Sequence, residues 1–308
     1  MSKNPAHQSE LETLLAIGSG LNADGGNERF KAIMHQLLSD LCNTIKTFDI
    51  TDEEFWIAVN YLNELGERKE AALLAAGLGL EHYLDMRADE KEAAAGSEIG
   101  TPRTIEGPLY VANAPLSQDF ARMDDGSEKA EAMWLHGKVT DLEGNPVPGA
   151  IVDIWHANTH GGYSFFDPSQ SEYNLRRRVK TAADGTYAAR SIVPCGYGCP
   201  PDGPTQKLLN GLGRHGNRPA HIHFFVSAPG FKHLTTQINL SGDQYLWDDF
   251  AFATRDGLIA DPVKVTDREI IAQRNLEGEH TEVCFDFTLC KALSADEEQR
   301  GIRVRAKE

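Results

Sequence analysis

The spacing of apolar residues changes along the chain, and the change predicts two kinds of structure. Between residues 30 and 45, apolar side chains recur three and four positions apart, which is typical of an amphipathic helix. A second helix is predicted to begin at a capping box made by Thr51 and Glu54 and to end near Gly66. A third is predicted from about residue 67 to residue 95, with an interruption at two glycines. We therefore expect the first hundred residues to be helical.

The first of these helices carries an apolar stripe whose role the sequence leaves open. The stripe consists of Phe30, Ile33, Met34, Leu37, Leu38, Leu41, Cys42 and Ile45. Such a stripe can pack into the protein core, contact a partner protein or face lipid, and core packing is the default expectation.

A different pattern begins at Trp134. Short runs rich in Val, Ile, Phe and Tyr alternate with turn sequences, of which GNPVPG at residues 144–149 is one. Asp184 and Gly185 form a second turn, and this dipeptide between two strand-like runs predicts a β-hairpin. Strands at this spacing, with no helices between them, predict an antiparallel β-sandwich, and one short helix is expected near residues 205–212.

Length and composition agree with this division. The chain has 308 residues, of which 41% are hydrophobic and 25% charged, as expected of a folded protein with one large domain or two modest ones. We predict an α+β fold, with a helical region at residues 1–105 and an antiparallel β-sandwich domain at residues 106–308.

Charge and cysteine content narrow the classes of function and the cellular compartment. A net charge of −16 argues against nucleic-acid binding, which needs a basic face. The longest apolar stretch is about half the length needed to span a bilayer, and the first residues lack the apolar core of a secretory signal. Five cysteines, an odd and sparse set, indicate reduced thiols. We expect a cytoplasmic protein without a membrane span.

Two histidines are the most informative local feature. His221 and His223 precede the apolar run FFV, and side chains at this spacing in a strand point to the same face. The pair is either two adjacent ligands of one metal ion or two ordinary strand histidines, and the spacing alone does not decide between them.

Other donors would have to complete such a metal site. A cupin-like site needs a glutamate shortly after the pair, but the following FFVSAPG has no acid. An amidohydrolase barrel needs alternating helices, and a ferrous site of two histidines and one carboxylate needs an acid that the sequence does not single out. Tyr163 and Tyr197 lie in the Gly-rich segments HGGYSFFD and CGYGCPPDGPTQ and are further candidates. Taken alone, most tyrosines are core or surface residues.

Six segments of the chain carry a family resemblance. They are TPRTIEGPLY (residues 101–110), IVDIWHANTHGGYSFFD (151–167), SIVPCGYGCPPDGPTQ (191–206), GRHGNRPAHIHFF (213–225), LTTQIN (234–239) and LWDDFAFATRDGL (246–258). These segments closely resemble the intradiol ring-cleaving dioxygenases, most of all those that act on catechol. The helical segment from Phe55 to Asp85 is also similar to that family, so the resemblance covers most of the chain.

The resemblance implies a non-haem ferric iron, Fe(III), and the side chains that hold it. By matching motifs, its ligands are Tyr163, Tyr197, His221 and His223. The family implies that Tyr163 stays bound to iron while Tyr197 leaves when catechol arrives. It also implies that Arg218 and Gln237 act in the active site, together with Tyr197 as a catalytic residue.

The same resemblance implies the reaction, the substrate pocket and the assembly. The reaction is the cleavage of catechol by dioxygen to cis,cis-muconate, in aromatic catabolism by the beta-ketoadipate pathway. The residues expected to line the pocket are Leu73, Ala76, Ile105, Pro108, Leu109, Phe250 and Ala251. The family further implies a homodimer formed through the helical region, with a lipid-like molecule bound in an apolar tunnel there.

The residue types suit this chemistry. Two phenolates and one hydroxide balance the charge of ferric iron while the imidazoles stay neutral, which matters in an interior of low dielectric constant. A free tyrosine titrates at about pH 10, so only the metal makes it a phenolate at neutral pH. Arg218 would stabilise negative charge that develops on the ring.

Three other functions remain alternatives at this stage. The same chemistry on hydroxyquinol or a chlorinated catechol would differ only in the shape of the pocket. A transthyretin-like sandwich that only binds ligands is an alternative of another class. A zinc hydrolase is a further one, although phenolates are uncommon zinc ligands.

Overall fold

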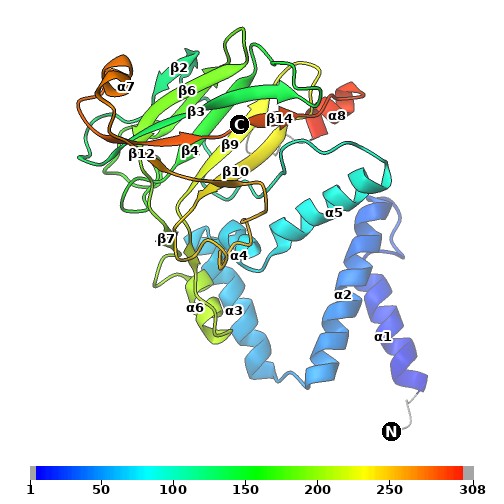
Figure 1. The fold of residues 1–308 in the computed structure, drawn as a ribbon. Helices are drawn as coiled ribbons and strands as arrows, with labels where there is room; N and C mark the ends of the chain where they lie inside the picture. The colour runs from blue at the N-terminus through cyan, green and yellow to red at the C-terminus, as the bar shows by residue number, and fades with distance from the viewer. Residues whose placement is uncertain (1–4, 301–308) are drawn as a thin grey trace. The chain divides into compact units, whose positions relative to one another are not determined.

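The structure, a computed structural model, describes residues 5–300, which divide into two compact units. The first unit ends at Glu67 and the second begins at Arg68. The first contains α1 (Pro5–Gly18), α2 (Glu28–Phe48) and all but the last residue of α3 (Asp52–Arg68). Helices α1 and α2 lie side by side (Figure 1), and Gly18 approaches the side chain of Leu38 there. The division into domains at residue 105 stays a prediction.

The helix ends follow the capping signals in the sequence. Before α2, the Asn27 side chain accepts a hydrogen bond from the backbone N–H of Phe30 at 2.9 Å. The predicted capping box is confirmed, because Thr51 N–H donates to Glu54 Oε2 at 2.9 Å and Glu54 N–H donates to Thr51 Oγ1 at 3.3 Å. The predicted third helix is present as α4 (Ala71–Gly77) and α5 (Leu80–Ala94), which separate where Gly79 adopts a φ of 74°.

The core packing expected of the α2 stripe is wrong for most of its residues. The larger side chains of the stripe, which are 40–63% exposed, are Phe30, Ile33, Leu37, Leu41 and Ile45. The periodic pattern therefore specifies the helix and its apolar face, but in the described residues of the first unit that face is left largely uncovered.

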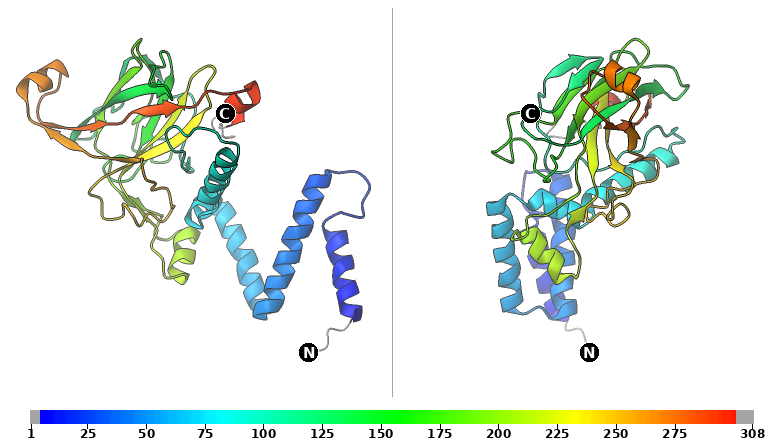
Figure 2. Two further views of the ribbon diagram at one scale, coloured as in Figure 1. Left: turned by 45° about the vertical axis from the view of Figure 1, so that its right-hand side comes forward. Right: turned by 60° about the vertical axis from the view of Figure 1, so that its left-hand side comes forward.

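The second unit contains a β-sandwich of two sheets packed face to face (Figures 1 and 2). The first sheet has the order β1 (Leu116–Gln118), β5 (Arg176–Lys180), β4 (Ile151–His156), β9 (His221–Ser227), β10 (Leu234–Leu240) and β11 (Ile259–Ala260). The second has the order β12 (Val263–Val265), β13 (His280–Cys284), β3 (Ala132–Asp141), β6 (Thr186–Ile192) and β2 (Phe120–Arg122), and β14 (Phe287–Leu289) also pairs with β3.

The predicted combination of a helical region and a β-sandwich is confirmed. The sandwich contains parallel as well as antiparallel strand pairs. The central pairs β5–β4–β9–β10 and β3–β6 are antiparallel, as expected. Strands β1, β2, β11, β13 and β14 add parallel pairs. The short helix expected near residue 205 is confirmed as α6 (Pro204–Gly211). Further short elements are β7 (Tyr197–Gly198), β8 (Asn217–Arg218), α7 (Arg268–Gln273) and α8 (Ala295–Arg300).

The β-hairpin predicted at Asp184 and Gly185 is wrong. The turn itself is present, since Asp184 Oδ1 accepts a hydrogen bond from Thr186 N–H at 3.1 Å and Gly185 has a φ of 79°. The strands on either side, β5 and β6, belong to different sheets. The turn therefore carries the chain across the sandwich, because an Asp-Gly dipeptide specifies a chain reversal but not which strands pair.

Strand β9 is buried on both of its faces. One face points into the core between the sheets, which includes Ile222, Phe224, Val226, Ile154 and Leu135. On the opposite face Phe225 packs edge-on against Trp155 of β4. Because side chains alternate along a strand, His221 and His223 lie on this second face with Phe225, as the sequence predicts.

Two further observations bear on the expected compartment. In residues 5–300 no helix combines the length and the apolar character needed to cross a membrane. The five cysteines are all free thiols.

Candidate active site

Three of the four predicted metal ligands meet at one point beside the first sheet. Tyr163 lies in the loop after β4, Tyr197 begins the short strand β7, and His221 begins β9. The two phenol oxygens are 3.3 Å apart, and His221 Nε2 lies 3.5 Å from Tyr163 Oη and 3.4 Å from Tyr197 Oη. The ring of His223 is next to that of His221, with centroids 4.8 Å apart. The structure thus brings three of the predicted donors to one point and places the fourth residue, His223, next to them.

Glycines allow the two tyrosines to approach. A Cβ atom on Gly161 would lie 2.5 Å from Tyr197 Cβ, and one on Gly196 would lie 2.7 Å from the carbonyl oxygen of Arg218. Gly161 also has a φ of 80°, which favours glycine. The side chain of Asn158 fixes the same loop by accepting a hydrogen bond from Gly162 N–H at 2.8 Å. The Gly-rich segments of the sequence therefore close the distance between the tyrosines.

The two histidines are held as neutral imidazoles. His221 Nδ1 lies 2.7 Å from the carbonyl oxygen of Pro219, so Nδ1 carries the proton and Nε2, which faces the phenols, is an acceptor. His223 stacks on Trp155 with an angle of 3° between the rings, and its buried Nδ1 has no hydrogen-bond partner among the described residues. Burial, together with the charge of Arg218, lowers the pKa of His221 to about 3 and that of His223 well below its usual value.

Both phenols are neutral at neutral pH as long as no metal ion lies beside them. Burial raises the pKa of Tyr163 well above its usual value, and it raises the pKa of Tyr197 as well. A bound metal ion reverses this preference, because it stabilises the phenolate directly.

Arg218 connects the histidine pair to a buried carboxylate. Its guanidinium donates to His221 Nε2 at 3.0 Å, to Gln237 Oε1 at 2.8 Å, and to both carboxylate oxygens of Asp249 at 3.1 Å. Burial disfavours the charged form of each side chain, but the attraction and hydrogen bonds between Arg218 and Asp249 have the larger effect. The pKa of Arg218 is therefore raised and that of Asp249 is lowered. Gln237 is held in turn by donating to Asn239 Oδ1 at 2.8 Å. The predicted Arg218 and Gln237 therefore belong to the same site as the four donors.

The sequence did not single out Asp249. It lies beside Asp248 in LWDDF, and the two residues are chemically identical. In the structure the Asp249 side chain is 1% exposed, whereas that of Asp248 is 79% exposed. The only signal in the sequence was the position of Asp249 next to the predicted pocket residue Phe250.

All but one of the predicted pocket residues belong to, or pack against, two buried clusters. Five of them, with Cys199, Leu209 and Ala253, form the first cluster: Leu73, Ala76, Ile105, Phe250 and Ala251. Leu109 packs instead against the second cluster, which includes Tyr163 and Tyr110, and Tyr197 packs there too. Pro108 is half-buried between Gly107 and Leu109 and belongs to neither cluster.

Arg214 links two segments that contribute to the first cluster. Its guanidinium donates to the carbonyl oxygen of Gly77, at the end of α4, at 2.7 Å, and to that of Phe250 at 3.1 Å. The same group lies 4.9 Å from the ring centroid of Phe252. Arg214 therefore fixes helix α4, which carries two predicted pocket residues, against the segment that carries two more.

The donor set fits a hard metal ion. The separations of 3.3–3.5 Å among three donors are those of ligands that share one ion with bonds of about 2.0–2.1 Å. Among residues 5–300, no group of three or more His, Cys, Asp or Glu side chains is placed to hold a metal, so an ion bound here takes the phenol oxygens as ligands. Anionic oxygen donors suit hard cations.

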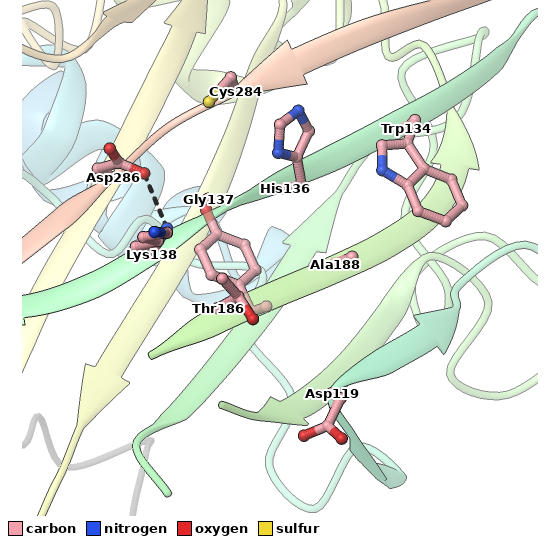
Figure 3. Close-up of a pocket in the computed structure, with 10 residues that line it drawn as sticks. Asp119, Trp134, His136, Gly137, Lys138, Thr186, Ala188, Cys284 and Asp286 are labelled. Atoms are coloured by element: carbon pink, nitrogen blue, oxygen red, sulfur yellow. Dashed lines mark hydrogen bonds between the residues drawn. The ribbon is translucent and has the colours of Figure 1, made fainter. Parts of the chain in front are cut away.

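A separate groove of about 500 Å³ lies on the second sheet (Figure 3). It is lined by Asp119, Trp134, His136, Gly137, Lys138, Thr186, Tyr187, Ala188, Cys284 and Asp286. Asp286 accepts a hydrogen bond from the Lys138 backbone N–H at 2.8 Å, which Figure 3 shows as a dashed line. None of the predicted metal, catalytic or substrate residues lines this groove.

Comparison with known proteins identifies relatives of this chain. The sequence profile of the family described as Dioxygenase matches residues 105–291, and that of Catechol dioxygenase N terminus matches residues 27–96. The catechol 1,2-dioxygenase of Acinetobacter guillouiae is 58% identical over 301 residues, covering 97% of this chain and 99% of that protein. The catechol 1,2-dioxygenase of Acinetobacter baylyi is 54% identical over 299 residues, covering 96% of each.

Solved structures agree with the sequence comparison. A catechol 1,2-dioxygenase from Acinetobacter sp. ADP1, solved with bound mercury as inhibitor, matches with a TM-score of 0.94 and 54% identity. The match covers 96% of this chain and 97% of that one. A hydroxyquinol 1,2-dioxygenase of Rhizobium sp. is more distant, with 35% identity over 87% of this chain and 91% of that protein.

Proposed function

The chain belongs to the intradiol ring-cleaving dioxygenases, and we propose that it uses dioxygen to cleave catechol between its two hydroxylated carbon atoms, giving cis,cis-muconate. The relatives that act on catechol share more than half of its residues across almost the whole chain, whereas the hydroxyquinol enzyme shares about a third. Catechol is therefore favoured over hydroxyquinol as the substrate.

The ligands of the proposed non-haem ferric iron are Tyr163, Tyr197, His221 and His223. The observation that carries this assignment is the convergence of two phenol oxygens and one imidazole nitrogen within 3.5 Å of one another. When bound, ferric iron draws electron density from the catecholate ring and so makes a ring carbon reactive toward dioxygen. The two neutral imidazoles add no charge, so the two phenolates and one hydroxide would balance the charge of the ion.

The two tyrosines have different roles in the proposed mechanism. Catechol that binds as a dianion would bring two negative charges and release two protons, so the balance requires the hydroxide and one phenolate to leave, each taking one proton. Tyr197 is half-buried and flanked by Gly196 and Gly198, whereas Tyr163 is 2% exposed and packs in the second cluster. Tyr197 Oη therefore accepts a proton from a catechol hydroxyl, and Tyr163 stays in place.

Arg218 acts on the substrate as a fixed cation. Its guanidinium is held by Asp249 and Gln237, so it needs no rearrangement when negative charge develops on the ring. The first cluster, around Ala76, Ile105 and Phe250, supplies an apolar wall that excludes water from this charge.

Family membership also supports proposals about the assembly and setting of the protein. We infer a homodimer formed through the helical region, with a lipid-like molecule bound there, because the apolar stripe of α2 is uncovered in the single chain. The reaction belongs to aromatic catabolism by the beta-ketoadipate pathway in the cytoplasm.

Iron content and colour test the proposed site. Phenolate-to-iron charge transfer should make the purified protein wine-red, and removal of iron with a chelator should remove both colour and activity. Restoring iron should restore both. The proposal is contradicted if the protein is colourless, contains zinc in place of iron and hydrolyses esters. It is also contradicted if the protein binds catechol without consuming oxygen.

A substrate panel separates the near alternatives. Catechol, methylcatechols, chlorocatechols and hydroxyquinol are compared by kcat/KM in one oxygen-uptake assay. We expect the highest value for catechol, and a preference for hydroxyquinol would overturn the substrate assignment while leaving the reaction type intact.

A further inference from the structure

Arg176 is a buried cation whose charge no carboxylate neutralises directly within the part of the chain that the structure describes. The residue, at the start of β5, is 1% exposed, and within residues 5–300 its guanidinium contacts a serine and a tyrosine ring but forms no ion pair with a carboxylate. Its Nε donates to Ser164 Oγ at 2.9 Å and one terminal nitrogen donates to the Ser164 carbonyl oxygen at 3.2 Å. The other terminal nitrogen is buried without a hydrogen-bond partner among residues 5–300. Burying a guanidinium without a charged partner costs free energy unless a nearby anionic group offsets that cost.

The group that faces this cation is the ring of Tyr163. The guanidinium carbon of Arg176 lies 5.7 Å from the ring centroid, within the range of about 6 Å for a cation above an aromatic face. Ser164, which holds the guanidinium, follows Tyr163 in the chain. The cation is therefore fixed against the side chain that the proposed mechanism keeps as a permanent iron ligand.

The carboxylate of Asp153 acts on this cation without forming an ion pair with it. Asp153 acts on Arg176 only at longer range, and burial raises the pKa of Asp153 to about 6. Its carboxylate accepts a hydrogen bond from Tyr110 at 2.8 Å. Burial lowers the pKa of Arg176 to about 10, so the guanidinium remains charged at neutral pH.

The neighbouring arginines of β5 are arranged differently. Arg177 donates to the carbonyl oxygens of Tyr173 and Arg176 at 2.7 Å, and Arg178 donates to that of Ala114 at 2.6 Å. Both are half-buried. Because side chains alternate along a strand, Arg177 points away from the face that carries Arg176. A run of three arginines thus contains one member with a distinct environment.

We propose that Arg176 supplies a fixed positive charge above the ring of Tyr163 and thereby stabilises that side chain as a phenolate when iron is bound. The inference rests on the proposed iron site. A phenolate spreads its negative charge into the ring, so a cation above the ring lowers the energy of the electrons that the ligand donates. The guanidinium is a supporting group and does not itself contact iron or substrate.

The energy of the charge-transfer band reports this effect. The guanidinium lies over the ring, so removing it raises the energy of the donor electrons on Tyr163 more than it raises the energy of the acceptor orbitals on iron. The gap between donor and acceptor then becomes smaller. The band should therefore move to longer wavelength. If a substitution at residue 176 acted only through packing, the position of the band would not depend on whether the new side chain is charged.

The test compares iron-loaded full-length variants without substrate. Arg176→Met removes the charge, Arg176→Lys keeps it, and Ser164→Ala removes the hydroxyl acceptor without changing any charge. Arg177→Met is the matched control, because it removes a neighbouring arginine that faces away from Tyr163. We expect a shift to longer wavelength for Arg176→Met and a wild-type band for Arg177→Met. Arg176→Lys and Ser164→Ala should lie close to the wild type.

Each outcome decides the proposal. An unshifted band in iron-loaded Arg176→Met overturns it, and so do equal shifts in Arg176→Lys and Arg176→Met. Loss of iron from Arg176→Met but not from Arg176→Lys supports it, whereas loss from both overturns it. If Arg176→Met does not fold, Arg176→Gln, which keeps a donor for Ser164, carries the same comparison. A wild-type protein with iron but no phenolate band would refute the proposed iron site itself.

Discussion

Replacing Asp249 with asparagine removes the buried charge that fixes Arg218, and it should cost both stability and turnover. The two side chains are 1% and 5% exposed, and the carboxylate accepts two hydrogen bonds from the guanidinium at 3.1 Å. Removing one partner of such a pair leaves an uncompensated charge and costs about 3–5 kcal/mol. The amide of the variant would keep one oxygen as an acceptor, so we expect the lower end, about 3 kcal/mol. For a unit of this size that lowers Tm by roughly 6–12 °C.

The effect on turnover follows from the loss of a preorganised cation. Arg218 would no longer be held toward the substrate, and losing one such group lowers kcat by about 100-fold. Binding of catechol to iron does not depend on this pair, so KM should change far less than kcat. Calorimetry and oxygen uptake measure the two effects on the same iron-loaded protein.

Asp248→Asn is the matched control. Asp248 adjoins Asp249 but is 79% exposed, and it pairs with His215 at 3.0 Å. An exposed pair contributes about 0–1 kcal/mol, so this variant should keep the wild-type Tm and kcat. If Asp249→Asn is as stable and as active as Asp248→Asn, the buried pair does not fix Arg218 and the reasoning is refuted.

Further predictions concern the ligands, the pocket, a buried acid and the assembly. Tyr163→Phe should lose iron, whereas Tyr197→Phe should keep some iron yet lose most turnover; iron analysis and anaerobic catechol titration check this, and normal turnover in Tyr197→Phe would contradict it. Enlarging Leu73 or Ala76 should shift preference among substituted catechols by about 10–200-fold in kcat/KM without removing iron; loss of iron would show that these residues are structural. Burial raises the pKa of Asp153 to about 6, so the folded state binds a proton that the unfolded state releases, and this residue's contribution to stability should fall as pH rises from about 4 to 6. Unfolding of Asp153→Asn by denaturant at several pH values should lack that fall, and an unchanged slope would refute the assignment. Light scattering at micromolar concentration should give the mass of a dimer, and a monomer would refute the inferred assembly.

Features that depend on local spacing were predictable from the sequence. Alternation along a strand was enough to place His221 and His223 on one face, and the capping box at Thr51 and Glu54 was enough to start a helix. Both depend on residues within one turn or one strand. The identity of the two tyrosines as partners of the histidines came from family motifs, because no local rule brings residues 34 and 58 positions apart to one point.

Features that depend on tertiary contacts were not predictable. Asp184 and Gly185 specify a reversal of the chain, but the next strand joined the other sheet. Nothing local distinguishes Asp249 from Asp248, because only the packing of β8 and the following loop buries one of them. The same applies to the stripe of α2: periodicity identifies the apolar face, but whether anything covers it depends on the rest of the assembly.

The central claim is tested most directly by identifying the product that the iron-loaded protein forms from catechol under isotopically labelled dioxygen. The proposed function predicts cis,cis-muconate that carries both labelled oxygen atoms, formed by protein that contains one iron per chain. A semialdehyde from cleavage beside the diol, a product without label, or full activity in protein stripped of iron would contradict it.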